Sequence, residues 1–175
     1  IEPISDFPSV AVSCFARETF KRLLENFNHE LITTTSMANI EIPIYRVFVA
    51  DKELAFFNAP VGASACVAIL EDLIAFGMKK LVLFGTCGVL DEDISETSII
   101  VPTAAIRDEG TSYHYQVASD EIVVNAGLQD FLLEFLDERG ISHSRGKVWT
   151  TDGIYRETAE KLLRRKEAGV SLSAS

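Results

Sequence analysis

Apolar residues along the chain follow two spacings, one typical of strands and the other of helices. Residues 81–84 form an unbroken apolar run that follows two lysines and ends at the loop 85–88, Gly-Thr-Cys-Gly. A short apolar run bounded by turn signals predicts a buried strand that leads directly into a tight loop. In residues 17–27, apolar side chains recur at helical spacing, which predicts an amphipathic helix.

The same patterns predict elements over the rest of the chain. Further strands are expected at residues 9–13, 31–35, 40–49, 54–57, 98–101 and 143–151, and further helices at residues 65–76, 122–139 and 158–166. Residues 40–58 are expected to form a hairpin. We expect Ser64 to cap a helix, Gly77 and Gly140 to end helices, and Pro102 to end a strand. Strands that alternate with helices predict an α/β fold containing a right-handed βαβ unit.

One loop carries candidate chemistry, and an acidic loop that follows it does not. Gly85 and Gly88 lack a Cβ, so the backbone between them can turn tightly and approach a ligand. Open α/β sheets bind ligands at the carboxyl ends of their strands, where this loop lies; a plain exit from the strand is the alternative. The acidic run 91–96 has Glu96 where an EF-hand needs glycine, so we interpret it as a solvated turn and expect no metal site.

Composition narrows the possible functions. A length of 175 residues with 47% apolar residues predicts a single globular domain over residues 1–175. The net charge of −10 argues against binding of nucleic acid or of an anionic membrane, and no apolar run is long enough to span a bilayer. Cys14, Cys66 and Cys87 form no Cys-x-x-Cys pair, which favours a cytoplasmic location.

Three separated stretches resemble one family in order and spacing. The loop 85–88 is similar to the Gly-(Ser/Thr)-(Cys/Thr)-Gly loop of the purine and uridine nucleoside phosphorylases. Residues 101–112 resemble the strand and loop that follow in that family, and residues 148–158 resemble its Ser-x-Asp-x-Phe-Tyr segment. The resemblance covers roughly residues 9–170.

This resemblance implies a fold, a reaction and a site. The fold would be a three-layer αβα sandwich with a central mixed, mostly parallel sheet, assembled into homo-oligomers from dimers to hexamers. The reaction would be reversible cleavage of a nucleoside by inorganic phosphate, with phosphate as co-substrate and no cofactor. The implied phosphate-binding residues include Gly85 and Thr86, and the implied nucleoside-binding residues include Cys87, Gly88, Ile154, Tyr155 and Arg156.

The chain departs from the family where phosphate-binding arginines are expected. Arg17 is out of register with the first of them, and Leu83 stands at the position of the second. Near the third, which a neighbouring subunit supplies, the chain has Ile40, with Arg46 six residues later. Phosphate requires strong charge-assisted donors, so Arg46 and Arg107 are the candidates to replace these arginines.

The final residues depart from the family as well. Residues 170–175, Val-Ser-Leu-Ser-Ala-Ser, resemble a segment in which Ser171 and Ser173 replace two glutamates. The glutamate that matches Ser173 binds the ribose hydroxyl groups, so Ser173 is a candidate nucleoside-binding residue with weaker acceptor capacity. The family continues beyond this point, so we expect the domain to be incomplete at its C-terminus; a degenerate relative is the alternative.

Three functions therefore remain open. The leading hypothesis is a nucleoside phosphorylase acting on a purine or pyrimidine nucleoside, uridine among them. The missing arginines favour a nucleosidase that uses water, and Ser171 and Ser173 favour a binding protein without activity. No catalytic residue is assigned: Cys87 has no base near it in the sequence, and His114 is interpreted as a surface histidine.

Overall fold

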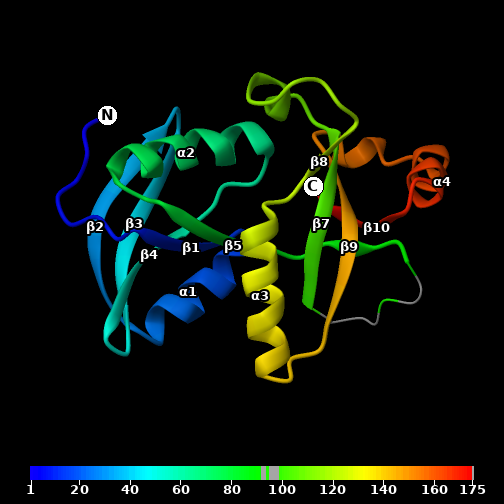
Figure 1. Cartoon of the computed structure of the whole chain (residues 1–175). Helices are drawn as coiled ribbons and strands as arrows, with labels where there is room; N and C mark the ends of the chain where they lie inside the picture. Colours follow the sequence, from blue (N-terminus) through cyan, green and yellow to red (C-terminus); the bar gives the residue numbers. More distant parts are fainter. Residues whose placement is uncertain (92–93, 95–98, 175) are drawn as a thin grey trace. The chain divides into compact units, whose positions relative to one another are not determined.

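A computed structural model describes residues 1–91, 94 and 99–174, and it divides the chain into two compact units (Figure 1). The N-terminal unit is Ile1–Gly85 and the C-terminal unit is Thr86–Ser175. Each unit contains its own sheet and its own helices. The predicted strand that precedes the Gly-Thr-Cys-Gly loop therefore belongs to one unit, and most of that loop belongs to the other.

The N-terminal unit is built on a five-stranded mixed sheet with the strand order β2-β3-β4-β1-β5. Its elements are β1 (Val10–Cys14), α1 (Arg17–Glu25), β2 (Asn28–Met37), β3 (Ile40–Val49), β4 (Lys52–Asn58), α2 (Ala63–Phe76) and β5 (Lys80–Phe84). Strand β1 is parallel to β4 and β5, whereas β2, β3 and β4 form antiparallel pairs. The predicted hairpin at residues 40–58 is confirmed, because Ile44 pairs with Phe57 across it.

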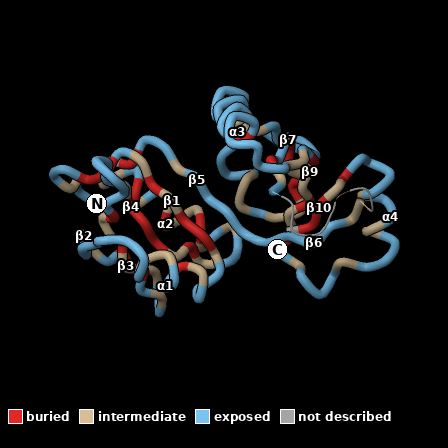
Figure 2. Tube along the Cα trace, turned by 90° about the horizontal axis from the view of Figure 1, so that it is seen from below, coloured by how far each residue is buried: buried red, intermediate tan, exposed pale blue. Residues whose placement is uncertain are grey.

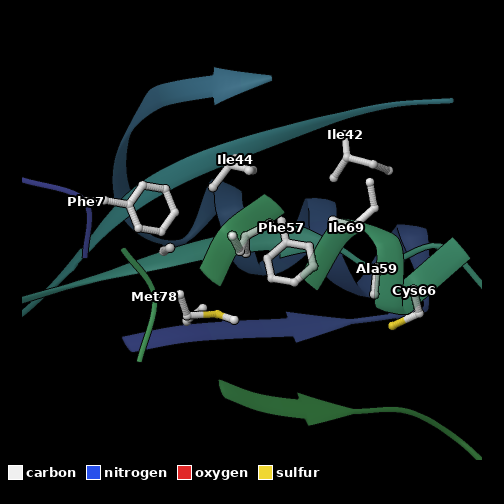
Figure 3. Close-up of a cluster of buried hydrophobic side chains, with 11 residues drawn as sticks. Phe7, Ile42, Ile44, Phe57, Ala59, Cys66, Ile69 and Met78 are labelled. Atoms are coloured by element: carbon white, nitrogen blue, oxygen red, sulfur yellow. The ribbon is translucent and has the colours of Figure 1, made fainter. Parts of the chain in front are cut away.

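Two helices cover opposite faces of this sheet. Successive strand residues point to opposite faces. Phe57 is buried in the cluster that includes Ile69 and Leu73 of α2 (Figure 3), and its neighbour Phe56 is buried in the cluster that includes Phe20 of α1. The unit is therefore a three-layer αβα sandwich, and it has an apolar core on each side of its sheet.

The C-terminal unit contains a second mixed sheet with the strand order β6-β10-β9-β7-β8. Its elements are β6 (Gly88–Val89), β7 (Ile99–Asp108), the 3₁₀ turn η1 (Thr111–His114), β8 (Glu121–Val123), α3 (Ala126–Glu138), β9 (His143–Thr151), the 3₁₀ turn η2 (Ile154–Arg156), α4 (Ala159–Glu167) and β10 (Val170–Ala174). Strand β9 is parallel to β7 and β10. Most buried positions of this unit lie along these three strands (Figure 2), and Leu136 of α3 is buried as well.

Several predicted boundaries are wrong for local reasons. Residues 122 and 123, expected to open a helix, form strand β8 against β7. Helix α3 begins only after Asn125, whose side chain caps it by accepting a hydrogen bond from Leu128 N. Pro102 does not end a strand; β7 continues to Asp108, and its pairing register with β9 shifts just after the proline. A register shift is one of the few positions at which a sheet tolerates proline.

Two further expectations also need correction. Gly62, with a φ of 100°, takes the N-cap position of α2 that was expected for Ser64. Strand β5, expected to be buried, forms the edge of its sheet, and Phe84 is 40% exposed. Apolar residues alone do not distinguish a central strand from an edge strand. The predicted stops at Gly77 and Gly140 are confirmed by positive φ angles of 134° and 62°.

Candidate functional site

The loop after β5 begins with a glycine whose missing side chain has a clear role. A Cβ atom placed on Gly85 would lie 2.9 Å from Cδ2 of Phe15, closer than real Cβ atoms approach other atoms. Gly85 therefore lets the backbone of β5 pass the Phe15 ring. The next residues, Thr86, Cys87 and Gly88, are exposed, and Thr86 and Cys87 donate their backbone N–H groups to no other described residue.

The structure brings together two of the predicted site residues, Gly88 and Ser173. Strand β6 is antiparallel to β10, and in this ladder Gly88 is the partner of Ser173. The pairing continues where Leu90 N donates to Ser171 O over 2.8 Å. Residues far apart in the sequence thus place the exposed loop beside the end of β10.

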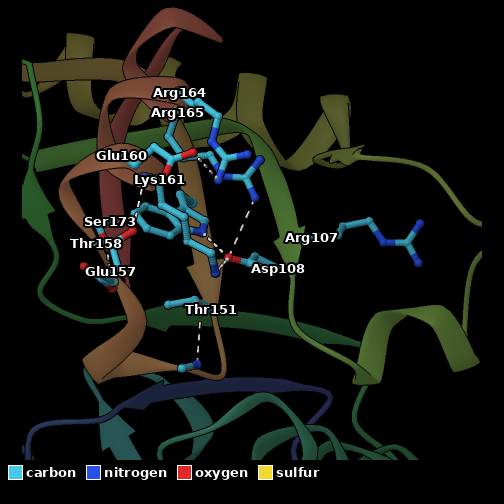
Figure 4. Close-up of polar contacts among 12 residues, drawn as sticks. Arg107, Asp108, Thr151, Glu157, Thr158, Glu160, Lys161, Arg164, Arg165 and Ser173 are labelled. Carbon is cyan, nitrogen blue, oxygen red and sulfur yellow. Dashed lines mark hydrogen bonds and ion pairs between the residues drawn. The ribbon is translucent and has the colours of Figure 1, made fainter.

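Ser173 holds a carboxylate that the sequence did not single out. The Ser173 side chain is buried, and its Oγ donates to Oε1 of Glu157 over 3.0 Å (Figure 4). Glu157 follows η2, sixteen residues before Ser173. No motif joins these two residues, so only the fold reveals that a carboxylate is hydrogen-bonded to Ser173, the ladder partner of Gly88.

The turn η2 carries the residues predicted to contact the nucleoside. Ile154 is 56% exposed and Tyr155 is 97% exposed, and Arg156 is exposed beside them. Hydrogen bonds order the residues before this turn: Gly110 N donates to Asp152 Oδ2 over 2.9 Å, and Gly153 N donates to Thr151 Oγ1 over 3.1 Å. Ile154, Tyr155 and Arg156 thus project from an anchored turn and not from the core.

Helix α4, which follows η2, is held to the sheet mainly by charge. Oδ2 of Asp108, at the end of β7, accepts hydrogen bonds from Lys161 Nζ over 3.0 Å and from Trp149 Nε1 over 3.1 Å (Figure 4). Arg165 lies 3.7 Å from the same oxygen. Burial raises the pKa of Asp108, but the hydrogen bonds and the charges of Lys161 and Arg165 outweigh it and leave the pKa below its ordinary value.

Arg107, a predicted phosphate-binding residue, is committed to the loop that contains η1. Its side chain is buried and donates hydrogen bonds to Ser112 Oγ (2.8 Å), to Ser119 Oγ (2.9 Å) and to the Val117 and Gln116 carbonyl oxygens (2.6 and 3.3 Å). Its guanidinium also lies 4.1 Å from the centre of the Tyr113 ring. These contacts favour a role in ordering the loop over a contact with phosphate.

Arg46, the other predicted replacement, lies on β3 in the N-terminal unit and is paired with carboxylates. Its NH1 atom lies 3.0 Å from Glu53 and its Nε atom 3.3 Å from Glu30. Its NH2 atom donates to the carbonyl oxygen of Asp6 over 2.8 Å. A phosphate at Arg46 would have to compete with two carboxylates that already neutralise the guanidinium.

The remaining candidates from the sequence are His114, Cys87 and the acidic run 91–96. His114 is exposed on η1, as expected for a surface histidine. Cys87 is an exposed residue, but partial burial of its sulfur raises its pKa; this favours the thiol and counts against a nucleophile. The interpretation of the acidic run 91–96 depends on Glu96, which lies outside the described residues.

Within the described ranges, no group of three or more His, Cys, Asp or Glu side chains is placed to hold a metal ion. None of the helices in the same part of the chain combines the length and the apolar character that a membrane crossing requires.

Comparison with known proteins identifies relatives of this chain. The guanosine phosphorylase of Halorubrum lacusprofundi is 24% identical over 122 residues, which are 70% of this chain and 51% of that protein. The uridine phosphorylase of Treponema pallidum is 25% identical over 117 residues, which are 67% of this chain and 45% of that protein. The chain thus spans about half the length of these curated relatives.

The fold also has solved counterparts. The crystal structure of uridine phosphorylase from Vibrio fischeri superposes with a TM-score of 0.84 and 19% sequence identity, over 98% of this chain and 71% of that chain. At such low identity, the superposition is evidence for the fold alone. It confirms the predicted nucleoside phosphorylase fold. The sequence model of the Phosphorylase superfamily matches residues 9–173. Because this match extends over nearly all of the sequence, the chain belongs to the Phosphorylase superfamily, in which its relatives are nucleoside phosphorylases.

Proposed function

We propose that the protein is a nucleoside phosphorylase that cleaves the N-glycosidic bond of a purine or pyrimidine nucleoside and releases a free base and a pentose 1-phosphate. Inorganic phosphate is the co-substrate in this proposal, and the reaction uses no cofactor. The relatives that support it are named for guanosine and for uridine, so both classes of base belong in the test.

One structural observation carries the proposal within the family. Gly88, at the end of the exposed loop, lies opposite Ser173, and the Ser173 hydroxyl holds the Glu157 carboxylate. Hydroxyl and N–H groups in a glycine-containing turn suit an anion, and a carboxylate suits the hydroxyl groups of a sugar. In this proposal, residues 86–88 supply donors for phosphate and Glu157 supplies an acceptor for the sugar, and Ser173 links the two through its ladder pairing and its hydrogen bond.

In this proposal, Thr86 contributes its hydroxyl and the loop its backbone N–H groups to phosphate. Attack of phosphate at the anomeric carbon would proceed through a sugar with developing positive charge. The protein would act mainly by positioning both reactants and by stabilising charge. Ile154 and Tyr155 would pack against the nucleoside, with Arg156 beside them on the same turn. The protein would act as a homo-oligomer of two to six copies, which native mass spectrometry can count.

Hydrolysis by water is the second candidate, and the contacts that already occupy Arg107 and Arg46 favour it. Arg107 is bound to its own loop, and Arg46 is paired with Glu30 and Glu53. Phosphate binds weakly where no charge-assisted donor is available, and a nucleosidase does not need such a donor.

The test is chromatography of guanosine, uridine and their 2′-deoxy analogues after incubation with the protein, with and without inorganic phosphate. Free base and pentose 1-phosphate, formed only with phosphate, are the expected products. Free base and free pentose in both incubations would replace the proposal with hydrolysis. A folded protein that cleaves none of these nucleosides would contradict both enzymatic functions.

A further inference from the structure

We infer that the Glu157 carboxylate binds the sugar hydroxyl groups of the nucleoside and makes the protein selective for ribonucleosides over 2′-deoxyribonucleosides. This inference rests on the proposed function, since it assigns one residue to the substrate of that same site. Glu157 lies between the exposed turn η2 and helix α4, in neither element.

The carboxylate is held in a defined position. Its Oε1 atom accepts the hydrogen bond from Ser173 Oγ at 3.0 Å, and Ser173 is fixed in β10 with 8% of its surface exposed. The ladder partner of Ser173 is Gly88, at the end of the exposed loop. Glu157 is therefore tied by a hydrogen bond to the strand residue that pairs with the end of the loop, and Figure 4 shows it beside Ser173.

This carboxylate has acceptor capacity to spare. Two carboxylate oxygens offer about four lone-pair positions, and the Ser173 hydroxyl occupies one of them. Within the described part of the chain, no lysine, arginine or histidine forms an ion pair with Glu157, although the residue is half-buried. Partial burial of a charge is unfavourable unless hydrogen bonds compensate for it. Donors from a ligand would supply that compensation.

A ribose offers suitable donors. Its 2′ and 3′ hydroxyl groups are adjacent, and a carboxylate can accept a hydrogen bond from each with its two oxygens. A 2′-deoxyribose lacks one of these donors and would leave one acceptor position unfilled. Because hydrogen bonds to a charged acceptor are stronger than neutral ones, this single difference is enough to discriminate between the two sugars.

A purely structural role for Glu157 makes a different prediction. If the carboxylate only ties η2 to β10, its removal would weaken the binding of every nucleoside to a similar extent. If it contacts the sugar, its removal would weaken ribonucleoside binding and leave the binding of 2′-deoxyribonucleosides less affected. The ratio of the two affinities distinguishes these roles, whereas a loss of activity would not.

The experiment measures dissociation constants by calorimetry for uridine and 2′-deoxyuridine, and for guanosine and 2′-deoxyguanosine. The variants are Glu157→Gln and a matched control, Glu160→Gln, which changes an exposed glutamate on α4 whose nearest basic partner, Arg164, lies 3.9 Å away. We expect Glu157→Gln to weaken ribonucleoside binding about tenfold or more, and 2′-deoxyribonucleoside binding by less than about threefold. Glu160→Gln should change neither affinity.

A second variant moves the carboxylate instead of removing it. Since Ser173 Oγ lies 3.0 Å from Oε1 of Glu157, a glutamate at position 173 can place a carboxylate in the same region. Adding Ser173→Glu to Glu157→Gln should therefore restore the preference for ribonucleosides at least in part. Circular dichroism spectra must show that both proteins are folded.

The outcomes separate this inference from the proposed function. A protein that binds and cleaves nucleosides, but whose selectivity is unchanged by Glu157→Gln, would overturn the inference and leave the proposed function intact. Equal losses for both sugars would assign Glu157 a structural role and overturn it as well. A folded wild-type protein that binds none of the four nucleosides would overturn both.

Discussion

The two units of the chain are stabilised in different ways. In the N-terminal unit, apolar clusters fill both faces of the sheet, with side chains such as Phe57 and Ile44 fully buried. In the C-terminal unit, a small apolar cluster around Trp149 is accompanied by buried Arg107 and Ser173 and by the Asp108 cluster with α4. Apolar packing depends on volume, whereas polar contacts depend on particular partner atoms. The C-terminal unit should therefore be the more sensitive of the two to pH and to conservative substitution.

The largest effect on stability is expected from a substitution that creates a cavity in the N-terminal unit. Phe57→Ala removes a ring that is fully buried on the α2 side of the sheet, and it should lower the free energy of unfolding by about 3–5 kcal/mol. Urea denaturation followed by circular dichroism measures this loss. The control is Phe48→Ala, at a ring that is 41% exposed, which should cost less than about 1 kcal/mol. Similar losses for both variants would contradict an interior stabilised by packing.

A smaller but more localised effect is expected at Arg107. Arg107→Ala removes the donors that hold the Gln116 and Val117 carbonyl oxygens and two serine hydroxyls, and it should cost about 2 kcal/mol. Hydrogen exchange should accelerate in residues 110–119 and stay unchanged in the N-terminal unit. The control is Arg139→Ala, whose guanidinium lies 4.5 Å from the centre of the Phe135 ring and which should leave that loop protected. Unchanged exchange in residues 110–119 would refute the loop-ordering role.

The smallest effect, about 1 kcal/mol at neutral pH, is expected from Asp108→Asn, and it should depend on pH. The pKa of Asp108 in the folded protein lies below its ordinary value of 3.8, so the ionised carboxylate stabilises the fold. This contribution is fully present above the unfolded-state pKa and is lost as the pH falls through the lower folded-state pKa. Denaturation of both proteins between pH 7 and pH 2 measures it.

The difference in stability between wild type and Asp108→Asn should therefore shrink toward acid pH. The control is Asp130→Asn, at an exposed position on α3, which should show no such trend. A difference that stays constant down to pH 2 would mean that the ion pairs of Asp108 with Lys161 and Arg165 do not stabilise α4.

Much of the candidate site could be located in the sequence, but its contacts could not. The resemblance singled out Gly88 and Ser173, and the fold makes them ladder partners. Arg107 and Arg46 were candidates to replace the family's missing phosphate-binding arginines, but a sequence shows only that an arginine is present and not which acceptors it meets. Glu157 was missed because its partner is sixteen residues away on another element.

The sequence by itself determined the family, the α/β class and the positions of most strands and helices. These depend on the local spacing of apolar residues and on short motifs, which a linear pattern contains. Tertiary structure alone decided which strand lies at an edge, where β7 passes Pro102, and which polar groups meet around Asp108, Arg107 and Ser173. Such contacts join atoms from distant segments, and their geometry arises only when the strands take up their register.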